Sequence, residues 1–198
     1  ALRDFAEDHE FAFYPTTLRN MAKYKDFPIE KGTRILYEEN LLSKYDANGK
    51  MEISDIILTE GAGAAMEESK MTVIHLSDLD FLIPDFALEP EKMWTKFSEL
   101  TFGKDIDFKD HERFSSMYYL RSDDEVSTRK FFHADLLSFL EGHDDMHIES
   151  HRNKILIYTK RDVLEPSEIS ELISNVNGLV ESMKNKSGQL HASNGLNR

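Results

Sequence analysis

The dipeptide Asn48-Gly49 limits the folds available to this chain more than any other short stretch of it. Asparagine and glycine readily adopt the positive φ angles of a type I′ turn, whose twist matches that of two antiparallel strands. Apolar residues flank the dipeptide at strand-like spacing. They are Ile35, Tyr37, Leu41, Tyr45, Met51, Ile53, Ile56, Ile57 and Leu58. The sequence therefore predicts a long β-hairpin over residues 33–58 and, with it, an antiparallel sheet.

Short stretches rich in β-branched and aromatic residues indicate further strands. They cover residues 11–13, 71–76, 106–108, 116–120, 147–149 and 155–158. Short connections join 106–108 to 116–120 and 147–149 to 155–158, so each of these pairs is expected to be antiparallel. Glycine and alanine dominate residues 60–66, which predicts a loop. A strand follows this loop, whereas a glycine-rich phosphate loop needs a helix there.

Four amphipathic stretches predict helices. They cover residues 2–9, 90–103, 122–142 and 166–183. Pro90 and Pro166 suit the first turn of a helix, because proline lacks only an N–H that the first turn leaves unpaired. Ser122 and Glu125 form a capping box for the third stretch, and Gly142 is expected to end it.

Strands with short connections and helices grouped apart from them predict an α+β fold, in which an antiparallel sheet carries its helices mainly on one face. Residues 1–186 are expected to form a single domain, and residues 187–198 a flexible polar tail. Two strand–strand–helix patterns, which align Tyr118 with Tyr158, suggest a pseudo-repeat. The predicted core includes Phe86, Trp94, Phe97, Phe108, Tyr118, Phe132, Leu136, Leu140, Ile148, Ile155, Ile157, Leu172 and Val176.

The formal net charge of -13 limits the partners of this chain. An acidic surface repels the phosphates of nucleic acids and the head groups of anionic lipids, so neither nucleic-acid binding nor direct adsorption to such a membrane is expected. The chain has no cysteine, which excludes disulfides, thiolate nucleophiles and cysteine-ligated metals. It also has no apolar run of about 20 residues, the length that spans a bilayer. Any membrane attachment is therefore expected to depend on sequence outside this chain.

Asp145, His147, Glu149 and His151 alternate with other residues along a predicted strand. Because residues two apart on a strand share a face, His147, Glu149 and His151 are candidate ligands for a divalent metal. The alternative is that Ile148 faces the core and leaves its neighbours on a hydrated surface. The second interpretation is favoured, because a hydrated strand face needs no ligand to explain it.

The sequence lacks the common catalytic and cofactor motifs. GxSxG, HExxH and the glycine-rich nucleotide motifs are all absent, so no cofactor is expected and the chain is expected not to be an enzyme. Residues 46–52 resemble a calcium loop only superficially, because their glycine is fourth and not sixth. His75 lies in an apolar stretch and His133 in a predicted helix, so both are expected to be structural.

Three stretches of the chain resemble an uncharacterised bacterial family. They are residues 82–91, 105–120 and 153–158. The first resembles the family pattern LP-x-F-x-L-x-PE, the second a DI-x-F strand followed by FS and Y-x-L, and the third a hairpin that ends in tyrosine. Ile83 is a mild departure, since the family usually has leucine before this proline. In that family the soluble domain commonly follows one or two transmembrane helices, and it has no assigned activity or ligand.

Two functions stay open at the level of the sequence. The resemblance implies a membrane-anchored protein whose domain lies in an aqueous compartment, expected to be the cytoplasm, and acts as an interaction or ligand-sensing module. Its partner would be another protein or a small ligand. The alternative function is a metal-dependent enzyme that uses the face of His147, Glu149 and His151. The alternative localisation is a soluble cytoplasmic protein.

We expect the complete coding sequence to contain about 17–25 consecutive apolar residues before Ala1, the length of a membrane-spanning helix. The expectation rests on the family resemblance and on the acidity of the chain, which would not hold it on an anionic bilayer unaided. Reading the gene upstream of this region tests it. An upstream extension without such a stretch would contradict the tether.

Overall fold

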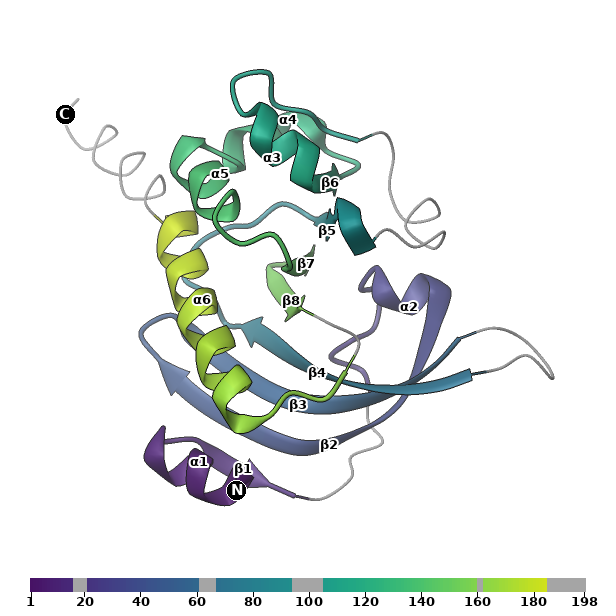
Figure 1. The fold of residues 1–198 in the computed structure, drawn as a ribbon, viewed down its shortest axis with the longest axis vertical. Helices are drawn as coiled ribbons and strands as arrows, with labels where there is room; N and C mark the ends of the chain where they lie inside the picture. Colours follow the sequence, from purple (N-terminus) through teal and green to yellow (C-terminus); the bar gives the residue numbers. More distant parts are fainter. Residues whose placement is uncertain (16–20, 61–66, 94–104, 160–161, 185–198) are drawn as a thin grey trace, which may run out of the picture.

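The computed structural model describes residues 1–15, 21–60, 67–93, 105–159 and 162–184 (Figure 1). In these residues one eight-stranded sheet has the order β1-β2-β3-β4-β8-β7-β5-β6, and its neighbouring strands are antiparallel. The strands are β1 (Ala12–Tyr14), β2 (Thr33–Asp46), β3 (Gly49–Glu60), β4 (Glu67–Ser77), β5 (Phe86–Pro90), β6 (Tyr118–Arg121), β7 (His147–His151) and β8 (Lys154–Tyr158). The helices are α1 (Leu2–Asp8), α2 (Ile29–Gly32), the 3-10 helix η2 (Glu91–Met93), α3 (Glu112–Met117), α4 (Glu125–Phe131), α5 (Ala134–Leu140) and α6 (Pro166–Lys184). The predicted α+β fold with an antiparallel sheet is confirmed.

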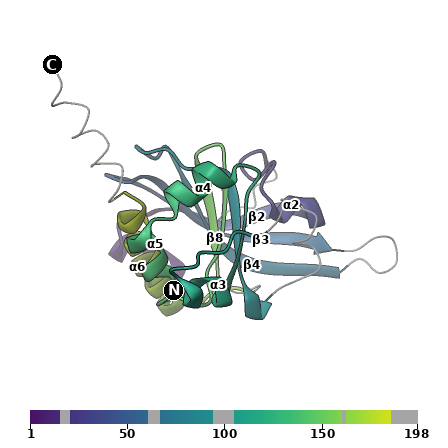
Figure 2. The ribbon, with the colours of Figure 1, turned by 90° about the horizontal axis from the view of Figure 1, so that it is seen from above.

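One face of the sheet carries most of the helices. Apolar side chains of α1 and α3–α6 pack there against those of the strands, and Figure 2 shows α5 and α6 together at the left, away from α2. Ten of the predicted core residues are buried in this layer: Phe86, Tyr118, Phe132, Leu136, Leu140, Ile148, Ile155, Ile157, Leu172 and Val176. Phe108 is only partly buried, and Trp94 and Phe97 lie outside the described residues.

The other face of the sheet is covered by residues 21–32, which include α2. Tyr24, Phe27 and Ile29 from this segment are buried against apolar residues of the strands. The strand residues in this second core are Ile35, Ile56, Leu58, Met71, Val73, Leu156 and Tyr158. Both faces of the central strands are therefore buried, and the expected hydrated face is absent where this segment lies.

The β2–β3 hairpin confirms the predicted pairing but corrects its turn. Asp46 pairs with Gly49, so Ala47 and Asn48 form the turn, and neither of them has a positive φ. The turn is not type I′ because the Asp46 carboxylate accepts the Asn48 N–H at 2.7 Å, an Asx arrangement that folds the chain one residue earlier. Gly49 takes the positive φ of 114°.

Two predicted helices differ in the structure. Pro90 ends β5 and is not the first residue of a helix; η2 follows it directly, and residues 94–103 of the predicted helix lie outside the described residues. The stretch after Ser122 forms α4 and α5, because Phe132 leaves the helical path to bury its ring, 5.0 Å from that of Phe86. Asp124, not Ser122, caps α4. None of the described helices is long and apolar enough to cross a membrane.

Residues 106–108 do not form the predicted strand. Only Asp105 makes a bridge, to Arg121, because its carboxylate accepts the N–H groups of Ile106 at 3.0 Å and Leu120 at 2.9 Å in place of further ladder bonds. The second proposed repeat contains both strands and the helix, as β7, β8 and α6. In the first proposed repeat, a single bridge at Asp105 stands in place of the first strand. The predicted tail 187–198 and most of the predicted loop 60–66 lie outside the described residues.

We predict that Gly49→Ala lowers the free energy of unfolding by at least about 2 kcal/mol, since a side chain at a positive φ is strained. The new Cβ would also lie 2.5 Å from the Ser77 carbonyl oxygen and 2.8 Å from that of Asp78. Urea unfolding measures the change. Gly142→Ala is the control, because its Cβ would meet only the Phe139 carbonyl oxygen, at 3.3 Å. Equal stability of the two variants would contradict the assignment.

Candidate functional site

The segment Met21–Ile29 lies across the second face of the sheet and is here called the strap. Its residues Tyr24 and Phe27 are 0% and 1% exposed, so the strap is packed against the strands along its length. Large buried side chains at positions 24, 27 and 29 hold it there. The groups beneath the strap are therefore removed from water, and several of them are ionisable.

Glu38 of β2 is the first buried carboxylate under the strap, with 1% of its surface exposed. Its Oε1 accepts hydrogen bonds from the Tyr24 hydroxyl at 2.7 Å and the Ser54 hydroxyl at 2.5 Å, and Lys23 Nζ lies 2.6 Å away. Burial and the neighbouring Glu38 raise the pKa of Tyr24, which keeps its hydroxyl protonated as a donor. A buried carboxylate is tolerated when donors surround it in this way.

Glu52 of β3 extends this network toward β4. Lys50 Nζ lies 2.9 Å from its carboxylate, Lys23 Nζ 3.4 Å and His75 Nδ1 3.6 Å. Burial alone would raise the pKa of Glu52, but these three neighbours outweigh it and lower the pKa. Burial likewise lowers the pKa of His75 against the pull of Glu52, so this imidazole is neutral beside a charged carboxylate at neutral pH.

The structure places the predicted candidates on one face of β7, as expected, but covers two of them. Glu149 is 2% exposed and accepts the Ile29 N–H at 2.9 Å and the Tyr158 hydroxyl at 3.2 Å. His147 is 7% exposed and stacks on Tyr158, with the ring centroids 4.6 Å apart. The expectation of a hydrated face was wrong for both, because the strap and its neighbours cover this part of the sheet.

The remaining candidates do not join them. His151 Nδ1 lies 3.0 Å from a carboxylate oxygen of Asp85, and Asp145 precedes β7 and is exposed. In the described part of the chain, no group of three or more His, Asp or Glu side chains has the arrangement of a metal site. Glu149 instead has one oxygen on the strap backbone and the other on Tyr158, which is the bonding of a structural carboxylate.

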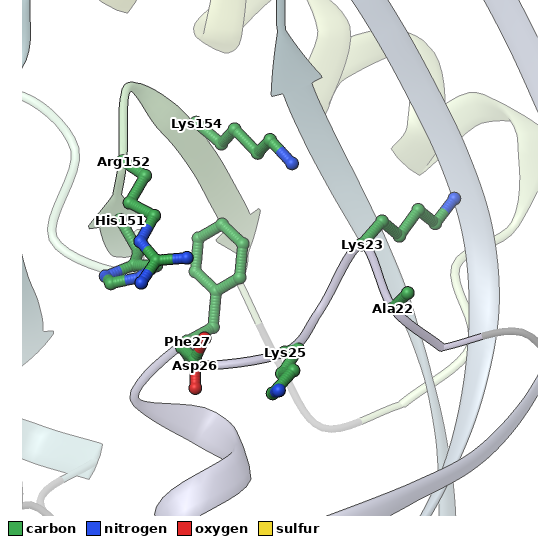
Figure 3. A pocket seen from close by; sticks show the side chains of 8 residues that line it. All are labelled: Ala22, Lys23, Lys25, Asp26, Phe27, His151, Arg152 and Lys154. Carbon is green, nitrogen blue, oxygen red and sulfur yellow. The ribbon is translucent and has the colours of Figure 1, made fainter.

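A pocket of about 150 Å³ opens between the strap and the turn that joins β7 to β8 (Figure 3). Its lining is mainly basic and comes from two segments that are far apart in the sequence. The lining residues are Ala22, Lys23, Lys25, Asp26, Phe27, His151, Arg152 and Lys154. Sequence reasoning missed this site, because its cations are scattered in an acidic chain and match no motif.

The cations of the pocket differ in how they are neutralised. Lys23 is paired with Glu38 and Glu52, and Figure 3 shows its ammonium group directed away from the other basic side chains. Lys25, Arg152 and Lys154 form no salt bridge with any residue that the structure describes. Asp26 is the single carboxylate of the lining. The lining thus carries more positive than negative charge on a protein whose net charge is -13.

Arg152 holds its place in the pocket at a conformational cost. Arg152 and Asn153 have φ angles of 48° and 60°, the left-handed region that asparagine and glycine tolerate and other residues rarely adopt. The Arg152 N–H donates to Asp85 at 2.8 Å, and the Asn153 side chain accepts the Ile83 N–H at 2.9 Å, so the turn is fixed from outside. Strained residues that the surroundings hold in place concentrate at functional sites.

We predict that the protein loses stability between about pH 6.5 and pH 4. Burial lowers the pKa of His147 from 6.5 to about 4. In this window the unfolded chain binds a proton that the folded chain does not, so stability falls as the pH falls, by up to about 3 kcal/mol for this group. His75, also buried, adds to the same trend.

Urea unfolding at several pH values tests this prediction. His147→Phe keeps the stacking on Tyr158 and should flatten the slope. His143→Phe is the matched control, because its ring also stacks on an aromatic, Phe139, but is only partly buried; it should retain the slope. A His147→Phe variant with the parent's acid slope would contradict the assignment.

Comparison of the chain with family models, curated proteins and solved structures gave no match. The resemblance to an uncharacterised bacterial family stays a prediction from the sequence.

Proposed function

We propose that this chain is a ligand-sensing module that binds a small anion in the pocket between the strap and the β7–β8 turn. The observation that carries the proposal is the presence of three cations in one pocket lining, Lys25, Arg152 and Lys154, none of which forms a salt bridge with a residue that the structure describes. The chain has 37 acidic and 24 basic residues, so acidic partners for salt bridges are plentiful. Basic side chains that line a pocket without salt bridges are therefore a candidate site for an anionic ligand.

The arrangement suits binding better than catalysis. Arginine and lysine attract and orient an oxyanion, whereas a reaction also needs a nucleophile or a free acid–base group beside it. His151 is the one imidazole of the lining, and Asp85 already holds its Nδ1. We also propose the membrane tether expected from the sequence, which the family resemblance and the acidity of the chain support. A tethered module of this kind would expose the pocket to the aqueous compartment.

Titration calorimetry with inorganic phosphate at low ionic strength tests the proposal, since salt would screen so exposed a site. Arg152→Gln/Lys154→Gln should weaken phosphate binding at least about tenfold, because two charges at contact distance are removed. Lys109→Gln/Lys130→Gln is the matched control: it removes the same charge from two exposed lysines outside the pocket. Equal weakening by both pairs, or no binding to the parent protein, would reject the pocket as the site.

A single substitution should separate stability from binding. We predict that Arg152→Gly leaves the free energy of unfolding unchanged or raises it by up to about 1 kcal/mol, because glycine relieves the strain at φ 48° but loses more backbone freedom on folding. The same change should weaken phosphate binding. Denaturant unfolding and calorimetry measure the two effects. A clear loss of stability would show that the arginine side chain is retained for packing and not for a ligand.

A further inference from the structure

We infer that the pocket takes a phosphoryl dianion, either inorganic phosphate or the terminal group of a phosphate monoester, held between Lys25 of the strap and Arg152 and Lys154 of the β7–β8 turn. This inference rests on the proposed function and names the class of its ligand. Three properties of the pocket support it: its charge, its size and the way the cations are distributed.

The charge of the pocket matches a dianion. Lys23 is neutralised by Glu38, at 2.6 Å, and so adds little to the field in the pocket. Lys25, Arg152 and Lys154 carry three positive charges, and Asp26 carries the one negative charge of the lining. A carboxylate or a phosphodiester has a single negative charge and would leave part of this field unbalanced. A phosphate monoester carries close to two charges at pH 7, since its second pKa is about 6.

The size of the pocket admits a head group and little more. Sites for drug-sized ligands measure about 300–1,000 Å³, and this pocket measures about 150 Å³. Its apolar lining consists of Ala22 and Phe27, too few residues to enclose a nucleoside or a lipid chain. The remainder of a larger ligand would therefore lie in solvent, and affinity would depend on the anionic group.

The cations of the lining come from different segments, and such a distribution suits a tetrahedral group better than a planar one. Lys25 comes from the strap, and Arg152 and Lys154 come from the turn and the start of β8 (Figure 3). The guanidinium of arginine pairs with two oxygens of one anion, and a lysine ammonium acts as a point charge on a third. A phosphoryl group offers three equivalent oxygens to such a set.

Methyl phosphate and dimethyl phosphate test the inference by calorimetry, because they differ in charge and hardly in chemistry. At pH 7.5 we expect methyl phosphate to bind the parent protein at least about tenfold more tightly than dimethyl phosphate or acetate. At pH 5 most of the methyl phosphate carries one proton and is a monoanion, so the ratio of its affinity to that of dimethyl phosphate should approach one. Dimethyl phosphate is a monoanion at both pH values and therefore serves as the reference for changes in the protein. Inorganic phosphate, titrated alongside, distinguishes the free ion from the esterified group as the preferred source.

Lys25→Gln should lower the preference for the monoester over the diester, and Lys109→Gln should leave it unchanged. Both lysines are exposed, so neither change is expected to prevent folding. Equal binding of methyl phosphate and dimethyl phosphate at pH 7.5, or a preference for methyl phosphate that persists at pH 5, would overturn the inference of a dianion. The proposal of an anion-binding module would then still stand. Absence of binding by every anion would overturn the proposed function itself.

Discussion

The charge of Glu38 beneath the strap is the constraint on which this face of the molecule depends. With 1% of its surface exposed, its carboxylate needs protein donors, because burial has removed the water that would otherwise solvate it. Tyr24 and Lys23 supply two of them, at 2.7 and 2.6 Å, and both belong to the strap. Loss of the strap would remove both of these donors and expose the carboxylate to water. The position of the strap on the sheet is therefore fixed by charge as well as by apolar packing.

A second carboxylate holds the other end of the strap. Glu149 accepts the Ile29 N–H at 2.9 Å, so the strap is attached to β7 as well as to β2. Between these points the Phe27 ring lies edge-on to His75 and to His151, with centroids 6.0 and 6.3 Å away. Phe27 thus joins the buried network to the pocket lining. The strap that forms one wall of the pocket is thus bonded to a buried carboxylate near each of its ends.

Local patterns in the sequence were sufficient for most of the strands and for the first and last helices, but they did not predict β5 and they placed a strand at residues 106–108 where none forms. The β7–β8 hairpin and α6 appear where alternation and the apolar stripe predicted them, since neighbouring residues determine both. The shared face of His147 and Glu149 was also foreseen. Its burial was not, because the strap that covers it lies more than a hundred residues away in the chain. Local sequence patterns predict which side chains share a face of a strand, but they do not predict which distant segment covers that face.

The alternation of Lys23, Tyr24 and Lys25 explains why the network and the pocket occur together. Tyr24 is fully buried, Lys23 turns its charge to Glu38 and Glu52, and Lys25 stays exposed at the pocket. One short segment thus neutralises the interior and builds the wall of the site. Lifting the strap from the sheet would also remove one wall of the pocket. An anion that binds only when the strap lies on the sheet would therefore stabilise that position of the strap by its free energy of binding. If the proposed function holds, anion binding and the burial of Glu38 would therefore stabilise each other, which is the property that a sensing module requires.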